Sequence, residues 1–234
     1  SRYEKERIGL SMASLRIDSI SLKLLQEVQK VRKTGLTFAP EAGSQRLRDV
    51  INKNVTEEDL INSVGAAFDL GYSNVKLYFM IGLPTETMED VEGIAELGYK
   101  VMERYYQVPK DQRGRGINVT ISTSCFVPKP FTPFQWEPQD TIEAMREKQK
   151  HLQKMLRKKG FTYNWHDPNL SLLEAVFARG DRRLSKVLIR AWELGCKFDG
   201  WDEYFKYEAW LQAFKDCGIE PEFYALRKRE LEEV

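Results

Sequence analysis

The chain has 234 residues and a mass of 27.3 kDa, enough for one large domain or a large domain with a small appendage. Hydrophobic residues make up 42% of the sequence and charged residues 30%, which excludes a globally disordered or fibrous chain. The net charge of +1 argues against a protein devoted wholly to polyanions. The sequence shows no apolar run of about 20 residues and no signal peptide, so we expect a cytoplasmic protein without a membrane partner.

Apolar, β-rich runs alternate with segments of helical periodicity over the first two thirds of the chain. The runs begin near Met12, Leu36, Val75, Ile117 and Phe161. Helical segments are predicted over 22–31, 44–51, 56–71, 85–101 and 142–155. This alternation predicts a parallel sheet with right-handed crossovers. Both a TIM-like barrel and an open doubly wound sheet fit, although five strands cannot close the usual eight-stranded barrel.

Two local patterns fix the ends of the helix predicted over 56–71. Thr56 with Asp59 three residues on forms a capping box, which satisfies free amide donors at a helix start. Gly71 is a natural left-handed stop. After about residue 166 the chain changes character, becoming helical and rich in tryptophan, and we expect a C-terminal helical appendage there.

The three cysteines, Cys125, Cys196 and Cys217, match neither a disulfide framework nor a C-x-x-C metal pattern. Only two histidines accompany them. We therefore expect partly buried thiols and no metal site within this sequence.

Unusual residues follow three predicted strands at the ends where parallel sheets bind ligands. Glu41 and Gly43 lie at the tip of the second run, Gly82 and Pro84 form a turn after the third, and a proline-rich segment follows the fourth. Each has an ordinary structural explanation. Glu41 near a helix start is favourable dipole electrostatics, and the other two are common loops. Their joint order favours a binding site.

Taken in order, these residues resemble the radical S-adenosylmethionine (SAM) superfamily. Glu41, Gly43 and Ser44 followed by Asn52-Lys53 resemble the segment after barrel strand four. The turn over 82–87 resembles the one after strand five, and 128–136 resembles the rim after strand six. The segment with Arg16 and Asp18 would be strand three, so the resemblance covers about the first 135 residues. It implies an α/β fold: a partial TIM-like (radical SAM) barrel over 1–165, from strand three onward, with a C-terminal helical appendage over 166–234.

The resemblance implies a set of SAM-binding residues but identifies no catalytic residue. Glu41 would contact the ribose or the methionyl part of SAM, and Lys53 would reach the methionyl carboxylate. Met80 would contact the adenine. The full set is Glu41, Ser44, Lys53, Tyr78, Met80, Gly82, Phe126 and Val127.

Two of these contacts differ in kind from the rest. The backbone at Phe126 and Val127 would hydrogen-bond the adenine edge. Tyr78 stands where some relatives have an aspartate for the ribose, so the second ribose contact is open.

The superfamily's C-x-x-x-C-x-x-C loop, which holds a 4Fe–4S cluster, is absent from this sequence. We therefore expect a fragment of a radical SAM enzyme that is inactive alone, with the missing N-terminal part of the same protein as its partner. The segment over 179–201 resembles a subgroup with an upstream cobalamin-binding domain, which leaves the use of cobalamin open. The substrate is not identified. The unpaired strand edges of a half barrel favour a homodimer.

An alternative function uses the basic region over 146–190, which could contact nucleic acid phosphates. RNA or a ribosomal protein is then a possible substrate or partner. The competing interpretation is a solvated amphipathic helix with Ile142, Met145, Leu152 and Met155 on its apolar face, and we favour it. In the tail, Leu188, Trp192 and Cys196 fall at helical spacing, which predicts that they are buried in a core.

Overall fold

The computed structural model describes residues 35–114 and 116–233. The strand expected near Met12, with Arg16 and Asp18, and the helix expected over 22–31 lie outside the described residues. The described chain forms two compact units. The first comprises 35–81, 85–124 and 147–165, and the second comprises 82–84, 125–146 and 166–233.

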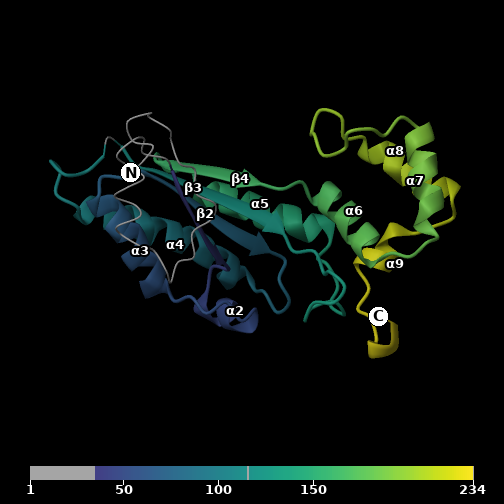
Figure 1. Ribbon diagram of the computed structural model, residues 1–234, viewed down its shortest axis with the longest axis horizontal. Coiled ribbons are helices and arrows are strands. Elements are labelled where there is room, and N and C mark those ends of the chain that lie inside the picture. Colours follow the sequence, from purple (N-terminus) through teal and green to yellow (C-terminus); the bar gives the residue numbers. More distant parts are fainter. Residues whose placement is uncertain (1–34, 115, 234) are drawn as a thin grey trace, which may run out of the picture. The chain divides into compact units, whose positions relative to one another are not determined.

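Among the described residues, four strands form the sheet of the first unit, in the order β1-β2-β3-β4. They are β1 (Leu36–Glu41), β2 (Asn74–Ile81), β3 (Asn118–Cys125) and β4 (Phe161–Trp165). Figure 1 labels β2, β3 and β4. β1 pairs parallel with β2, and β3 pairs parallel with β4. Because the strand order follows the chain order, right-handed crossovers place every connecting helix on one face. In a doubly wound sheet, by contrast, the order of the strands reverses at a switch point, and helices cover both faces. The α/β fold with parallel βα units of the barrel type is therefore confirmed.

The helices between these strands are α2 (Gln45–Val50), α3 (Glu57–Asp69), α4 (Met88–Gln107) and α5 (Ile142–Met155). The capping box predicted for α3 is confirmed, because Thr56 Oγ1 accepts from Asp59 N at 3.1 Å and Asp59 Oδ2 accepts from Thr56 N at 2.9 Å. Gly71, with φ 77°, follows the end of this helix as expected. A second capping box, of Thr87 and Asp90, opens α4.

The strands alternate between a buried face and a more open one. In β2 every second residue is buried, from Val75 to Ile81, and α4 packs on this strand. Lys76, Tyr78 and Met80 occupy the opposite face and are partly exposed or exposed. This is the pattern of a sheet with helices on one side only.

The second unit contains α6 (Pro168–Arg179), α7 (Leu184–Glu193), α8 (Tyr207–Asp216), α9 (Pro221–Ala225) and a short 3-10 turn, η2 (Leu231–Glu233). The apolar faces of α6, α7, α8 and α9 form one hydrophobic core, which includes Leu172, Val176, Val187, Ala213 and Phe214. The C-terminal helices expected from the sequence are thus present.

The aromatic stripe predicted for the tail is partly wrong. Leu188 and Trp192 are 49% and 63% exposed. The buried face of α7 runs through Leu184, Val187 and Ala191 instead, one residue out of phase with the predicted stripe. Cys196 is buried as expected, but it lies beyond the end of α7.

Part of the basic region is paired within the protein. Lys148 Nζ lies 2.7 Å from Glu86 Oε1, and the two side chains are 13% and 2% exposed. Arg183 pairs with Asp181, and Arg190 pairs with Asp216. These pairings weaken the nucleic-acid alternative.

Met145 and Leu152 of α5 are buried, as the amphipathic interpretation of this helix predicts. Within 35–114 and 116–233, no helix is long and apolar enough to span a membrane.

Candidate functional site

The carboxyl end of β1 departs from regular strand geometry. The register with β2 shifts between Phe38 and Glu41, and Glu41 has a φ of 71°. That left-handed conformation is uncommon for residues other than glycine. Asn52, in the following loop, has a φ of 54°. Such departures gather at functional sites, where a bulge re-aims a side chain.

Glu41 and Lys53 meet at this strand end. Lys53 Nζ donates to Glu41 Oε1 at 3.2 Å, with side chains 33% and 29% exposed. A partly exposed pair of this kind adds little to stability. Its two charges can therefore rearrange toward a ligand that carries both an anionic and a cationic group.

Arg48 positions the loop that carries Lys53. Arg48 is buried, at 2% exposure, and Lys53 N donates to Arg48 O at 2.8 Å. Burial lowers the pKa of Arg48. The guanidinium donates to the backbone oxygens of Ala42, Gly43 and Val55 and to Gln45 Oε1, at 3.0 to 3.1 Å. One buried side chain thus ties the loop to the strand end.

Gly43 lets the corner after β1 lie directly against α4. A Cβ at this position would stand 2.2 Å from Asp90 O and 2.4 Å from Ile94 N. Gly93 of α4 faces the same contact from the other side. Only glycine allows two backbones to approach this closely.

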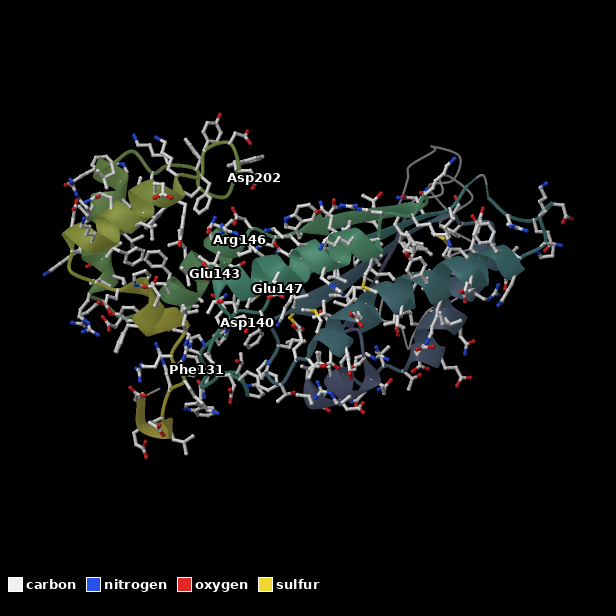
Figure 2. All side chains as sticks on the ribbon, turned by 180° about the vertical axis from the view of Figure 1, so that it is seen from behind. Phe131, Asp140, Glu143, Arg146, Glu147 and Asp202 are labelled. Carbon is white, nitrogen blue, oxygen red and sulfur yellow. The ribbon has the colours of Figure 1, made fainter. Side chains whose placement is uncertain are left out.

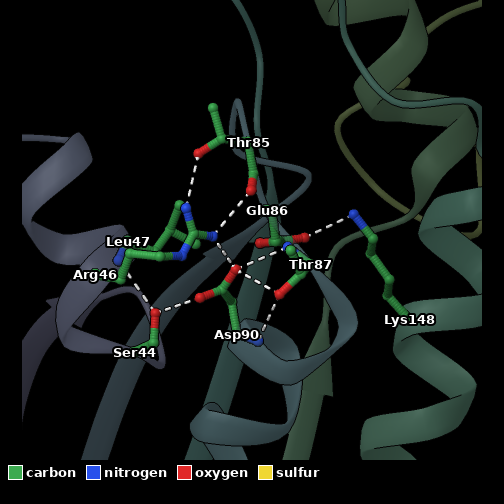
Figure 3. A network of polar contacts seen from close by, with 8 residues as sticks. All are labelled: Ser44, Arg46, Leu47, Thr85, Glu86, Thr87, Asp90 and Lys148. Carbon is green, nitrogen blue, oxygen red and sulfur yellow. Dashed lines mark hydrogen bonds and ion pairs between the residues drawn. The ribbon is translucent and has the colours of Figure 1, made fainter.

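Asp90 anchors the polar network at this corner (Figure 3). Its carboxylate accepts from Ser44 Oγ and from Arg46 Nη2, and from Thr87 N at 2.7 Å. Burial alone would raise the pKa of Asp90, but the hydrogen bonds from Ser44, the Thr87 backbone and Arg46 outweigh it and lower the pKa from 3.8 to about 2. Arg46 also donates to Thr85 O at 2.9 Å.

Ser44 is occupied by this network and by its own helix. Its Oγ accepts from Leu47 N at 3.1 Å as the N-cap of α2 and donates to Asp90. The structure therefore gives Ser44 a positioning role, and its predicted contact with SAM stays a prediction.

The open face of the sheet continues from this corner. Glu41 pairs in register with Phe79, which is adjacent to Met80. Tyr78 is 37% exposed, and Lys76 Nζ lies 4.4 Å from its ring centroid. Three of the less buried positions of β3 carry hydroxyl groups: Thr120, Ser122 and Ser124. The face thus combines an aromatic ring and a thioether with hydroxyls, a surface suited to a flat polar ligand.

The other three predicted residues belong to the second unit. Gly82 has a φ of 80°, and Val127 packs against the core of this unit. Phe126 is 8% exposed, and its backbone oxygen accepts from Gln139 Nε2 at 3.0 Å. The structure thus brings Glu41 and Lys53 together within the first unit. Gly82, Phe126 and Val127 belong to the second unit.

A hollow of about 470 Å³ also lies in the second unit. Glu143 and Arg146, near the start of α5, line it. Both residues are labelled in Figure 2. Arg146 Nη2 donates to Asn169 Oδ1 at 3.0 Å. Burial, followed by the charge of Glu222, raises the pKa of Tyr207 in its wall. No sequence pattern indicated this hollow, because its walls come from separate helices.

The three cysteines do not fit an iron–sulfur cluster. Cys125 and Cys196 are buried and Cys217 is partly buried. Burial raises the pKa of Cys125 to about 11, which keeps it a neutral thiol, whereas a cluster needs thiolates. Among the described residues, no group of three or more histidine, cysteine, aspartate or glutamate side chains is placed to hold a metal ion.

Sequence reasoning singled out Glu41 and Lys53 but missed Arg46, Arg48 and Asp90. The capping spacing from Thr87 to Asp90 was an available signal for one of them. No local pattern indicated that Arg48 would be buried, since its four acceptors come together only in the folded loop.

Two comparisons with known proteins found sequences similar to this chain. Residues 2–98 match the Radical SAM superfamily. The chain is also 38% identical, over 181 residues, to Uncharacterized protein MJ0966 of Methanocaldococcus jannaschii, an alignment that covers 77% of this chain and 37% of that protein. The chain thus spans well under half the length of this relative. The family match includes Glu41, Lys53, Tyr78 and Met80. Residues 2–98, which make up less than half of this chain, are thus similar to the radical SAM superfamily.

Proposed function

We propose that the chain supplies the SAM-binding part of a radical SAM enzyme. The single observation that carries the proposal is the Glu41–Lys53 pair, held 3.2 Å apart at the bulged end of β1. It stands in the segment that matches the superfamily and at the end of a parallel sheet where ligands bind.

The residues of this face fit SAM by charge and by shape. The methionyl end of SAM carries an α-carboxylate and an α-ammonium group. Lys53 is proposed to bind the carboxylate, and Glu41 the ammonium or a ribose hydroxyl. Met80 would pack on the adenine, and Tyr78 would stand beside the ribose. SAM, when bound to a reduced 4Fe–4S cluster, would supply the radical chemistry of the enzyme.

The proposed contacts from Ser44, Gly82, Phe126 and Val127 are secondary. Ser44 would act by holding the corner in place through Asp90. Phe126 O already accepts one hydrogen bond, from Gln139, so an adenine contact would use its second lone pair.

We infer that the cluster ligands belong to polypeptide outside this sequence, because the cysteines present do not fit a cluster. The relative's greater length is compatible with this. A cobalamin-binding domain upstream, as in the subgroup that the tail resembles, is a further part of the proposal, and the substrate is open.

SAM binding by the 234-residue polypeptide tests the proposal. Isothermal titration with S-adenosylhomocysteine, which is chemically stable, would measure the dissociation constant without cleavage. Lys53→Met removes the cation opposite the methionyl carboxylate, and we expect it to weaken binding about tenfold or more, as loss of a charge-assisted hydrogen bond does.

The matched control is the ion pair Lys100–Glu57, at 2.7 Å, which joins α4 to α3. Lys100→Met removes the same charge from the first unit, away from the end of β1, and should leave the dissociation constant unchanged. Equal weakening by both variants would show that binding follows net charge and would contradict the proposed site. Absence of saturable binding by the wild-type chain would contradict the proposal as well.

A further inference from the structure

The segment after α9 returns to the carboxyl end of α6 and is held there by arginine. Arg179, the last residue of α6, is 4% exposed. Its Nη1 donates to Ala225 O at 2.9 Å and its Nη2 donates to Arg227 O at 3.0 Å. Arg229 Nη2 donates in turn to Arg179 O. The three arginines thereby lie together in the second unit, close enough that the charges of Arg229 and Arg227 act on Arg179.

Their charges are only partly compensated. Glu233 pairs with Arg227, with both carboxylate oxygens 2.7 Å from Nη1. Asp181 is already paired with Arg183. Burial, and then the charges of Arg229 and Arg227, lower the pKa of Arg179 to about 10. Glu233 compensates the charge of Arg227, and Asp181 compensates that of Arg183. The positive charges of Arg179 and Arg229 are left without a compensating carboxylate among these residues.

The same arginines carry buried donors that lack a partner. Within the part of the chain that the structure describes, the Nε atoms of Arg179, Arg227 and Arg229 are buried without a hydrogen bond. So is Nε1 of Trp136, a residue whose backbone oxygen accepts from Arg229 N at 2.9 Å. A buried donor without a hydrogen bond destabilises the folded protein, because it has lost its water and gained no acceptor. All four atoms are donors, so an acceptor is what would complete the cluster.

The kind of acceptor follows from the number and chemistry of the donors. Several planar guanidinium groups around one site match the oxygens of a phosphate group. The two uncompensated charges match a phosphate dianion. We propose that Arg179, Arg227 and Arg229 form a binding site for a phosphate group, separate from the SAM-binding face proposed above. Such a group would also lock the segment over 226–233 onto α6.

Titration of the 234-residue chain with inorganic phosphate, at constant ionic strength set with sodium chloride, tests this site. We expect saturable binding with one site per chain. Arg229→Met should weaken it at least about tenfold. Because Arg229 also holds the backbone of α6, circular dichroism must show that this variant is folded.

A second variant keeps the test independent of stability. Arg227→Lys preserves the charge opposite Glu233 but removes the Nε donor, and it should also weaken phosphate binding at least about tenfold. Arg182→Met, which removes an exposed arginine of the neighbouring loop, is the matched control and should leave binding unchanged.

Three outcomes would overturn the proposal. The first is no saturable phosphate binding by the wild-type chain, which would make the cluster a brace alone. The second is equal weakening by Arg182→Met, which would indicate a general charge effect. The third is acetate binding as tightly as phosphate, which would make the site one for carboxylates. None of these measurements uses SAM. The phosphate site and the SAM-binding face are therefore tested independently of each other.

Discussion

At the scale of single residues, Asp90 joins two segments through one carboxylate. Ser44 and Arg46 come from the corner after β1, and Thr87 comes from the start of α4. The residue is 3% exposed, so its hydrogen bonds are shielded from water. Its contribution to stability should therefore be measurable, in contrast to that of surface pairs.

Asp90→Asn removes the charge and keeps the shape. The pKa of Asp90 is lowered from 3.8 to about 2, which corresponds to about 2 kcal/mol in favour of the folded state at neutral pH. We expect the variant to lose about that amount in urea unfolding at pH 7. Asp69→Asn, in an exposed pair with Arg104, is the control and should cost under about 0.5 kcal/mol.

The lowered pKa of Asp90 makes the free energy of unfolding depend on pH. A depressed pKa stabilises the folded protein above the unfolded value, and this stabilisation is lost as the pH falls from about 4 through 2. The difference between wild type and Asp90→Asn should therefore shrink to under about 1 kcal/mol at pH 2. A difference that is constant from pH 7 to pH 2 would show that the carboxylate charge is not the cause.

Lys148 gives a second prediction at this scale. Its partner Glu86 is 2% exposed at the side chain, so Lys148→Met leaves a buried carboxylate without its cation. We expect a loss of about 3 kcal/mol in unfolding free energy, because removing one member of a buried pair is strongly destabilising. Lys154→Met, at an exposed position of the same helix, should be neutral, and equal losses would show that α5 tolerates no change.

The sequence indicated roles for Glu41 and Lys53 but not for Lys148. Glu41 and Lys53 stood out because each lies in a recognisable motif beside a predicted strand. Lys148 looked like one member of a solvated basic face, because its sequence neighbours are basic. Its burial depends on Glu86, 62 positions away, and no local pattern carries that information.

At the scale of elements, the contact between the corner after β1 and α4 depends on Gly43. Gly43→Ala would place a methyl group 2.2 Å from Asp90 O and 2.4 Å from Ile94 N. Both atoms are backbone, so neither can swing away. We expect a loss of about 3 kcal/mol or more in thermal or urea unfolding.

Gly35→Ala is the control for this prediction. Its Cβ would meet Asn74 at 3.7 Å, an ordinary contact. The substitution should therefore change stability by less than about 1 kcal/mol. Loss of SAM binding by Gly43→Ala without loss of stability would instead make Gly43 a direct ligand contact.

Element boundaries were predictable where a strong local signal exists. The runs starting at Leu36 and Phe161 begin strands at those residues, and Val75 and Ile117 lie within one residue of strand starts. Capping residues fixed α3 equally well. The stripe through Trp192 misled because a spacing of four fits either of two adjacent helix faces, and only packing against α8 selects Val187 and Ala191 as the buried one.

At the scale of the whole molecule, the sequence left a barrel and a doubly wound sheet open, because both use the same βα units. The strand order β1-β2-β3-β4 decides between them. That order is a property of long-range pairing, which no single segment encodes. Within residues 35–114 and 116–233, it leaves one sheet face free of crossover helices, and this is the face where the candidate site lies.

The buried and partly buried cysteines of this polypeptide make it unfit to hold an iron–sulfur cluster. After anaerobic reconstitution with iron and sulfide, the 234-residue chain should bind no 4Fe–4S cluster and release no 5′-deoxyadenosine from SAM in the presence of dithionite. The reason is the state of its thiols: burial raises the pKa of Cys125 to about 11 and also raises that of Cys196, so both resist the deprotonation that iron ligation requires. Iron and sulfide analysis with chromatography of the nucleoside products would measure both quantities. Release of 5′-deoxyadenosine by the wild-type chain would contradict this prediction. If the triple variant Cys125→Ala, Cys196→Ala and Cys217→Ala abolished that release, these cysteines would be cluster ligands after all. If the release survived in the triple variant, the cluster would not need thiolate ligands from this chain.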